Sequence, residues 1–180
     1  MKVVIRPKKM SDCRRCEEIV TLVWNQTYKG IVSDEFLKYL EYNEKRRAED
    51  AIKDFRNNKD MVVVVEVEGL VVGFIKFGEA QEENSKGLGE IKNLYILKDY
   101  QKKGFGKKLL YNAARLCRTC GMQYMIVGCL KENENANGFY QHTGGKLIGS
   151  RYYTKTNQNL PENIYAYNLQ ELIDEYSTNK

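Results

Sequence analysis

Residues 94–107 read LYILKDYQKKGFGK, and this stretch decides the fold that the rest of the chain is expected to adopt. The apolar run at its start predicts a strand, and the residues after it predict a turn that opens a helix at about Gly104. The first N–H groups of a helix have no partner within the helix, and the helix dipole is positive at that end. Gly104 and Gly106 remove side chains that would keep a ligand away from this backbone. The stretch therefore predicts a binding site for a diphosphate group.

Lysine side chains add positive charge around this turn. They are Lys102, Lys103, Lys107 and Lys108. A pair of glycines is weak evidence by itself, because tight turns and helix starts use glycine for conformational reasons. The turn alone is thus consistent both with a phosphate site and with a simple helix start.

The spacing of apolar residues on either side predicts an α/β protein. Apolar residues at every third or fourth position predict helices, whereas β-branched runs predict strands. Glu68-Gly69 marks the turn of an antiparallel hairpin within 61–80. Ser11 and Ser33 are candidate helix caps, and Gly30 ends the first helix. The expected order is strand 3–6, helices 11–28 and 33–57, strands within 61–80 and at 90–97, a helix from 104, strand 123–130, helix 135–142, and strands 146–154 and 164–169.

This order predicts one α/β domain over residues 1–180, built on a mixed sheet. The polar stretch 81–89 is expected to be a loop, and residues 177–180 are expected to fray. No repeat, low-complexity segment or linker divides the chain.

Composition narrows the classes of partner. The formal net charge is +5, from 29 basic and 24 acidic residues, which favours an anionic ligand but falls short of the dense basic stripe of a nucleic-acid-binding protein. No apolar run has the length of a membrane span, and the first residues do not read as a secretory signal. We therefore expect a cytoplasmic protein with neither a nucleic-acid nor a membrane partner.

Two cysteine pairs, Cys13 with Cys16 and Cys117 with Cys120, have the C-x-x-C spacing found in zinc sites. Each pair lies within a predicted helix, on or near its apolar face, where a thiol behaves as a small hydrophobic group. We therefore expect no metal, and stoichiometric zinc is the alternative.

Two separated motifs resemble those of the GNAT family of N-acetyltransferases. QKKGFG at 101–106 resembles the acetyl-CoA-binding motif, Gln-x-x-Gly-x-Gly, directly after its strand. NENANGFY at 133–140, followed by Gly144-Gly145, resembles the Asn-x-x-Ala-x-x-Phe-Tyr helix and its glycine. The segment 23–37, VWNQTYKGIVSDEFL, is similar to the acceptor-side helix pair of many members. The resemblance covers about residues 3–170 and implies a largely antiparallel sheet of about seven strands flanked by about four helices.

The resemblance implies transfer of an acetyl group from acetyl-CoA to a primary amine, by direct attack in a ternary complex. The main chain of Leu94, Tyr95 and Ile96 would pair with the pantetheine arm, and Asn133 would hold the cofactor from the other side. The pyrophosphate would lie at the turn formed by Gln101, Lys102, Lys103, Gly104, Phe105, Gly106 and Lys107.

Tyr140 and Glu90 are the candidate catalytic residues. The resemblance implies that Tyr140 protonates the departing thiolate, and the alternative is that it packs the short helix beside Phe139. Glu90 would remove a proton from the amine, directly or through water, and its alternative is an exposed residue at a strand end. Other members use a glutamate on the next strand, where this chain has Gly128.

Several alternatives stay open. The acceptor is a small molecule, a polyamine or a peptide N-terminus, and family relatives often form homodimers. Trp24 and Tyr28 either line the acceptor pocket or anchor the first helix. Cys129 is the one weak candidate for a nucleophile in a ping-pong route. The alternative to an enzyme is a non-catalytic acyl-CoA-binding regulatory module on the same fold.

Overall fold

The computed structural model describes residues 2–81 and 87–178. Within these residues, seven strands form a sheet in the order β1-β2-β3-β4-β5-β7-β6, and the α-helices number six. The expected α/β class and the seven-stranded sheet are confirmed. Residue contacts divide the chain into two units: the first comprises Met1–Lys76 and Asn93–Leu109, and the second comprises Phe77–Lys92 and Leu110–Lys180. The single domain over residues 1–180 stays a prediction.

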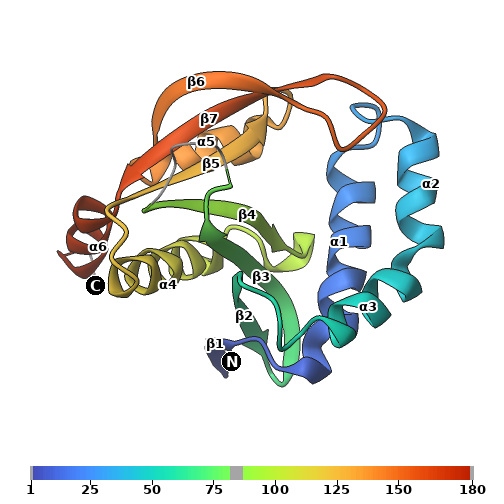
Figure 1. Ribbon diagram of the computed structural model, residues 1–180, viewed down its shortest axis with the longest axis horizontal. Helices are drawn as coiled ribbons and strands as arrows, with labels where there is room; N and C mark the ends of the chain where they lie inside the picture. Colours follow the sequence, from blue (N-terminus) through green and yellow to red (C-terminus); the bar gives the residue numbers. More distant parts are fainter. Residues whose placement is uncertain (1, 82–86, 179–180) are drawn as a thin grey trace. The chain divides into compact units, whose positions relative to one another are not determined.

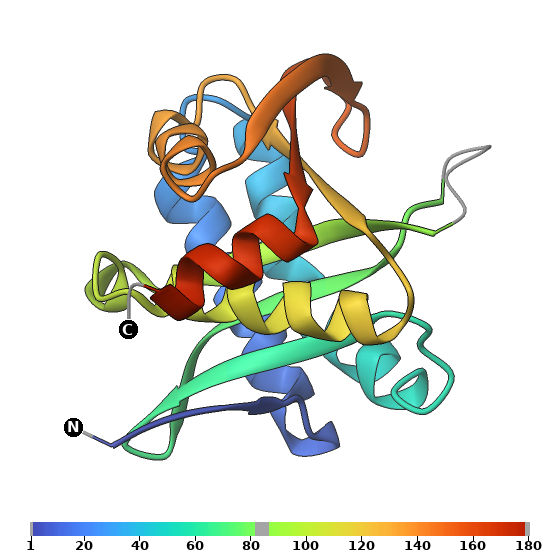
Figure 2. The same ribbon diagram turned by 90° about the vertical axis from the view of Figure 1, so that its left-hand side faces the viewer.

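The expected hairpin is present in the first unit. β2 (Met61–Val67) and β3 (Leu70–Glu79) are joined by Glu68 and Gly69, which have φ angles of 49° and 83°. Two successive positive φ angles form a two-residue turn whose twist matches that of paired strands. β1 (Val3–Pro7) pairs antiparallel with β2 (Figure 2).

The first helix begins later than its sequence suggests. A single 3-10 turn (Met10–Asp12) precedes α1 (Cys13–Thr27), so Ser11 lies inside this turn and its predicted role as a cap is wrong. The Asp12 carboxylate instead accepts the main-chain N–H of Lys9 at 2.7 Å, which closes the turn.

The helix expected over 33–57 is two helices, α2 (Asp34–Tyr42) and α3 (Glu44–Lys53). Asn43 separates them, because its side chain donates to the carbonyl of Tyr39 and ends the first helix. The cap at Ser33 is confirmed, since its hydroxyl accepts the N–H of Phe36 at 3.3 Å. Figure 1 shows α2 lying alongside α1.

The apolar face of α1 forms the core of the first unit. Cys16, Ile19 and Val23 pack against Val64, Val71 and Phe74 of the hairpin. Complete burial of an aliphatic or aromatic side chain contributes about 1.5–3 kcal/mol. The apolar residues of the hairpin and those at helical spacing on α1 therefore bury one another in a single core.

The second unit holds the mixed part of the sheet. β4 (Leu88–Ile96) runs parallel to β5 (Tyr124–Leu130), with Leu88 to Ile91 opposite Tyr124 to Val127. β5 pairs antiparallel with β7 (Leu160–Asn168), and β7 pairs antiparallel with β6 (Lys146–Tyr153) (Figure 1). A mixed, largely antiparallel sheet is thus confirmed.

Three helices contribute to the second unit. α4 (Phe105–Thr119) begins in the first unit and continues in the second, and α5 (Glu134–His142) matches its prediction. α6 (Leu169–Thr178) was not predicted, although Leu169, Leu172 and Tyr176 have helical spacing. Tyr176 stacks on Tyr111 of α4 with ring centroids 4.0 Å apart. Residues 82–86 of the predicted loop and residues 179–180 of the predicted frayed end lie outside the described residues.

None of the helices in the described parts of the chain is long and apolar enough to cross a membrane.

Asp12 is expected to make the stability of the protein depend on acid pH. Burial alone would raise the pKa of Asp12, but hydrogen bonds from Arg6 and from the N–H of Lys9 lower it below its usual value. A group with a lowered pKa stabilises the folded state above the unfolded pKa, and this contribution is lost as the pH falls through the folded value.

We therefore predict that Asp12→Asn lowers the free energy of unfolding by about 1–3 kcal/mol at neutral pH and flattens its decline between about pH 5 and about pH 2. Urea unfolding across this pH range measures the effect. Glu49→Gln, at an exposed position of α3, is the control and should keep the wild-type slope. Equal slopes for wild type and Asp12→Asn would contradict the prediction.

Candidate functional site

The predicted diphosphate turn lies in the first unit, between β4 and α4. Lys102 and Gly104 both have a left-handed backbone, with φ angles of 57° and 79°. The side chain of Gln101 donates to the carbonyl of Ile96 at 2.9 Å and closes the loop. The N–H of Lys108 donates to the carbonyl of Gly104 at 3.1 Å, so residues 105–107 form the first turn of α4, whose N–H groups point out of the helix end.

The turn is open and positively charged. Gln101, Lys102, Lys103 and Gly104 are exposed, whereas Phe105 is buried and anchors the helix start. A Cβ at Gly104 would meet no atom within 4 Å, so the main chain there is accessible. Lys103 Nζ lies 5.3 Å from the ring centre of Tyr100. An accessible helix N-terminus beside lysines fits a diphosphate.

The last residues of β4 lie beyond the part of the strand that pairs with β5. That parallel pairing covers Leu88 to Ile91, while Leu94, Tyr95 and Ile96 follow it and are half-buried. The Tyr95 side chain is committed to packing, because its hydroxyl accepts the indole N–H of Trp24 at 2.9 Å and burial raises its pKa. A ligand beside Tyr95 would therefore contact its main chain and not its side chain.

Trp24 anchors α1. Its side chain is buried, and its ring lies 4.6 Å from that of Tyr28 and 5.3 Å from that of Phe36. Together with the bond to Tyr95, this fits the anchoring interpretation of Trp24. Tyr28 is half-buried beside it.

In the second unit, Glu90 lies in an ion-pair network. Its Oε1 accepts from Nη2 of Arg151 at 3.0 Å, and Oε2 of Glu162 accepts from Nε of the same arginine at 2.6 Å. The side chain of Glu90 is 16% exposed and that of Glu162 is 7% exposed. Glu90 is therefore not an exposed residue at a strand end, and β4 begins two residues before it, at Leu88.

Gly128 lies against the carboxylate of Glu162. A Cβ built at Gly128 would be 2.6 Å from Glu162 Oε1 and 2.8 Å from Oε2. The space in which a side chain at position 128 would begin is thus filled by a carboxylate from β7. Neither Glu162 nor Arg151 belongs to a motif in the sequence: Glu162 precedes the strand expected at 164–169, and Arg151 lies within the strand expected at 146–154.

Tyr140 is part of the packing of α5. It is 6% exposed, and its ring lies 5.9 Å from that of Tyr165 and 5.3 Å from that of Phe139. Its carbonyl accepts from the Gly145 N–H and the Tyr167 hydroxyl, both at 2.9 Å. Phe139 is only half-buried, so more of the packing falls to Tyr140 than expected. The role of Tyr140 as a proton donor stays a prediction.

Two asparagines hold α5 in place, one by capping the helix and one by joining it to the sheet. Asn133 caps the helix by accepting the N–H of Ala136 at 3.1 Å, and its role toward the cofactor stays a prediction. Asn137 is buried, donates to the carbonyls of Leu130 and Asn133 at 2.8 Å each, and accepts the Tyr165 hydroxyl at 2.8 Å. Asn137 was missed because it lies between the motif positions.

Three of the five cysteine thiols are poor nucleophiles. Burial raises the pKa values of Cys16, Cys117 and Cys129 to about 12 each, so these groups stay protonated near neutral pH. Cys120, by contrast, is exposed. Among the described residues, no group of three or more His, Cys, Asp or Glu side chains is arranged to hold a metal ion.

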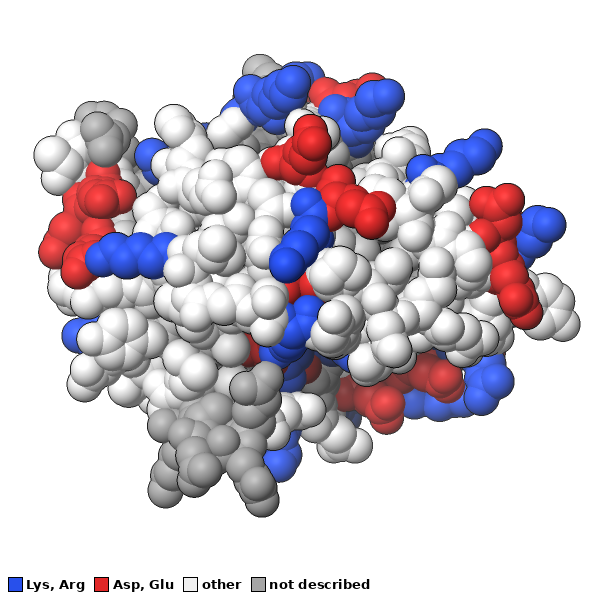
Figure 3. Space-filling view, turned by 90° about the horizontal axis from the view of Figure 1, so that it is seen from above, with Lys and Arg blue, Asp and Glu red and all other residues white. Residues whose placement is uncertain are grey.

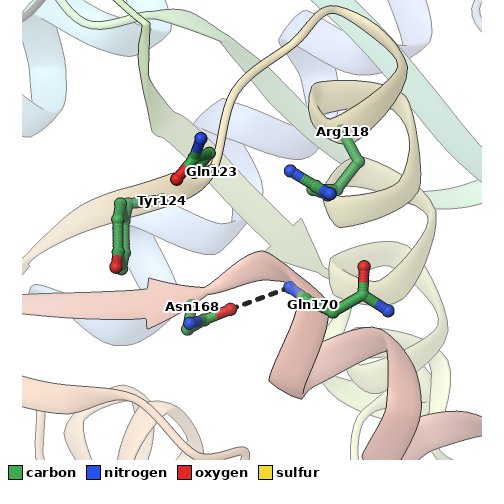
Figure 4. Close-up of a pocket in the computed structure, with 5 residues that line it drawn as sticks. All are labelled: Arg118, Gln123, Tyr124, Asn168 and Gln170. Atoms are coloured by element: carbon green, nitrogen blue, oxygen red, sulfur yellow. Dashed lines mark hydrogen bonds between the residues drawn. The ribbon is translucent and has the colours of Figure 1, made fainter.

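The pocket shown in Figure 4 contains none of the predicted site residues. It has a volume of about 280 Å³ and lies in the second unit, where β7 turns into α6. The carboxamide oxygen of Asn168 accepts the N–H of Gln170 at 3.0 Å within it. Its lining residues are Arg118, Gln123, Tyr124, Asn168 and Gln170.

Charged side chains of both signs lie close together on the face drawn in Figure 3, beside wide uncharged areas. This pattern differs from the single-sign field that binds a nucleic-acid backbone.

The fold is shared with the solved structures of an N-acetyltransferase and of a protein bound to acetyl-CoA. The PaiA N-acetyltransferase from Thermoplasma acidophilum, solved in complex with coenzyme A, superimposes with a TM-score of 0.74 at 19% sequence identity, over 93% of this chain and 99% of that chain. YncA from Salmonella typhimurium, solved with acetyl-CoA, gives a TM-score of 0.67 at 20% identity, over 94% of this chain and 95% of that one. Likeness at this identity establishes the fold.

Sequence comparison establishes the family. Residues 18–145 match the acetyltransferase (GNAT) family, and this chain belongs to it. The uncharacterized N-acetyltransferase YuaI of Bacillus subtilis is 30% identical over 139 residues, which are 77% of this chain and 78% of YuaI. The spermidine N(1)-acetyltransferase of Thermoplasma acidophilum is 22% identical over 150 residues, 82% of this chain and 90% of that protein. The resemblance inferred from the two motifs is confirmed, as is the class of enzyme, an acyltransferase.

We predict that Asn137→Ala loosens α5. The change removes the donor to the Leu130 carbonyl and the acceptor shared by the Tyr165 hydroxyl and the Asn163 amide, at a cost of about 2–4 kcal/mol of unfolding free energy. Urea unfolding measures the cost, and amide hydrogen exchange should rise throughout α5. Asn135→Ala, at an exposed position of the same helix, should change neither. Equal effects of the two substitutions would show that Asn137 does not hold the helix.

Proposed function

We propose that this protein transfers the acetyl group of acetyl-CoA to a primary amine of a small molecule, a polyamine or a peptide N-terminus. The observation that carries the proposal is the glycine turn 101–106 at the start of α4, inside the segment that matches the family. Relatives with bound coenzyme A or acetyl-CoA support acetyl-CoA as the co-substrate.

Main-chain groups bind the cofactor in this proposal. Leu94, Tyr95 and Ile96 pair with the pantetheine arm through their N–H and carbonyl groups. The turn Gln101–Lys107 holds the diphosphate, with main-chain N–H groups at its helix end and lysine side chains around it. Gln101 serves this turn mainly by closing it against Ile96.

Glu90 and Tyr140 carry the proton transfers in this proposal. A free amine with a pKa near 10.4 is mostly protonated at neutral pH, so it must lose a proton before it attacks the thioester. Glu90 accepts this proton directly or through water. Tyr140 donates a proton to the departing thiolate, and Asn133 contacts the cofactor.

Direct attack in a ternary complex is favoured over a ping-pong route. A covalent intermediate would need an activated nucleophile, and the buried Cys129 thiol has its pKa raised to about 12. Further parts of the proposal are a cytoplasmic location and a homodimer.

A polyamine is the acceptor class that we place first. The spermidine N(1)-acetyltransferase relative supports it, and spermidine is a cationic amine. The second candidate function is a non-catalytic acyl-CoA-binding regulatory module, which is favoured by the burial of Tyr140. Binding of acetyl-CoA without turnover on any amine would select the second candidate.

Acetyl-CoA is expected to stabilise the protein in a thermal-shift titration. A ligand that binds only the folded state adds about 2.7 kcal/mol at a hundredfold excess over its dissociation constant. Acetyl-CoA and CoA should give a saturable rise in Tm, while ATP, which lacks the pantetheine arm, should give a much smaller one. The absence of any shift at millimolar acetyl-CoA would mean that the turn is only a helix start.

Tyr140→Phe is expected to lower kcat by roughly a hundredfold or more, because it removes the proposed proton donor while keeping the ring that packs on Tyr165. The dissociation constant for acetyl-CoA should stay within about twofold. Tyr152→Phe, at an exposed position of β6, is the matched control. Steady-state kinetics with spermidine as the probe acceptor measure both. A loss for Tyr140→Phe no larger than that for the control would remove Tyr140 from the mechanism.

A further inference from the structure

The strand register of the second unit places four residues on one face of the sheet. Glu90 on β4 lies opposite Ile126 of β5, and Gly128 is two residues further along the same face. On β7, Glu162 is two residues from Ile164, the partner of Gly128, and its own partner on β6 is Arg151. Side chains two residues apart along a strand share a face, so Arg151 and Glu162 reach Glu90 across Gly128.

Arg151 uses two different nitrogens for the two carboxylates. Nε donates to Glu162 at 2.6 Å and Nη2 donates to Glu90 at 3.0 Å. The planar guanidinium holds these donors in fixed relative directions, so the bond at Nε sets the direction of Nη2. Arg151 itself is on a strand at the end of the sheet order, and its side chain is 37% exposed. The buried Glu162 is therefore the member of the network with the least freedom to move.

Gly128 is what allows Glu162 to take this position. Any side chain at residue 128 would begin 2.6–2.8 Å from the Glu162 carboxylate, and the carboxylate would have to move. With glycine there, Glu162 lies over the main chain of β5. The two carboxylates and one guanidinium together carry a net formal charge of −1, which suits a cationic acceptor.

We propose that Glu162 is a positioning residue of this enzyme, which fixes Arg151 and through it the carboxylate of Glu90. The inference rests on the proposed function, in which Glu90 accepts the proton of the amine. Gly128 belongs to the same arrangement, since it leaves the space that the Glu162 carboxylate fills.

The chain contains a matched control for this arrangement. In the first unit, Arg6 bridges Asp12 and Glu66, with bonds of 2.7 Å to each carboxylate. Glu66→Gln therefore removes one carboxylate from a shared, partly buried arginine in the same way as Glu162→Gln. A purely structural effect of losing such a charge should be similar in both variants.

Kinetics with acetyl-CoA and spermidine test the coupling to Glu90. Glu162→Gln should lower kcat roughly ten- to hundredfold with KM for acetyl-CoA unchanged, because a displaced catalytic group costs rate. Glu66→Gln should keep the wild-type kcat. In a Glu90→Gln background, Glu162→Gln should cause no further loss, whereas independent effects would multiply. Multiplying losses, or equal losses for Glu162→Gln and Glu66→Gln, would overturn the proposal.

NMR of protein with ¹³C-labelled glutamate carboxyl groups tests the positioning without any turnover. The Glu90 signal, assigned by its disappearance in Glu90→Gln, should shift in Glu162→Gln and in Gly128→Ala, and should stay within its line width in Glu66→Gln. An unmoved Glu90 signal in Glu162→Gln and Gly128→Ala would refute the positioning role. Because this readout needs no acceptor, it decides the inference even if wild type acetylates no amine, a result that would count against the proposed function alone.

Discussion

The structure depends on the need to present main-chain N–H groups at the start of α4. Those groups lack partners within the helix, so they must face solvent or an anion. The chain meets this requirement by reversing direction through the left-handed residues Lys102 and Gly104, and Gln101 holds the loop closed through Ile96. Burial of Phe105 then fixes the helix start against its core. A strand, a glycine turn and a helix thereby form the turn that we propose binds the diphosphate of acetyl-CoA.

The second unit buries several polar groups, and hydrogen bonds pair them with one another. Asn137, Tyr165 and Tyr167 join α5 to β5 and β7 by hydrogen bonds, and Arg151 serves two carboxylates on the sheet. Unpaired, each such group would cost about 1–3 kcal/mol. Polar residues on these strands therefore fix the carboxylate of Glu90 through Arg151 and the main chain of Tyr140 through Tyr167. The ring of Tyr140 packs between Phe139 and Tyr165.

Elements that neighbouring residues specify could be predicted from the sequence. Contacts between residues far apart in the sequence could not. The hairpin at Glu68-Gly69 and the turn before α4 were predicted, because glycine and β-branched runs specify them locally. The break at Asn43 was missed, since an asparagine inside a helical pattern is a weak signal. The start of β7 was not predicted, because it contains Pro161 and proline is uncommon within strands. Because Glu162 lies in this unrecognised part of β7, its ion pair with Arg151 could not be predicted. Its contact with Gly128 could not be predicted for the same reason.

The most direct test of the account is amine-dependent release of CoA. Purified protein, acetyl-CoA and spermidine are mixed, the thiol is followed with a colorimetric reagent, and the amine product is analysed by mass spectrometry. We predict that one CoA is released for each N-acetyl group formed, at a rate that saturates in both substrates. If acetyl-CoA binds but neither spermidine nor a panel of small amines and peptide N-termini is acetylated, the account of the protein as an N-acetyltransferase is contradicted.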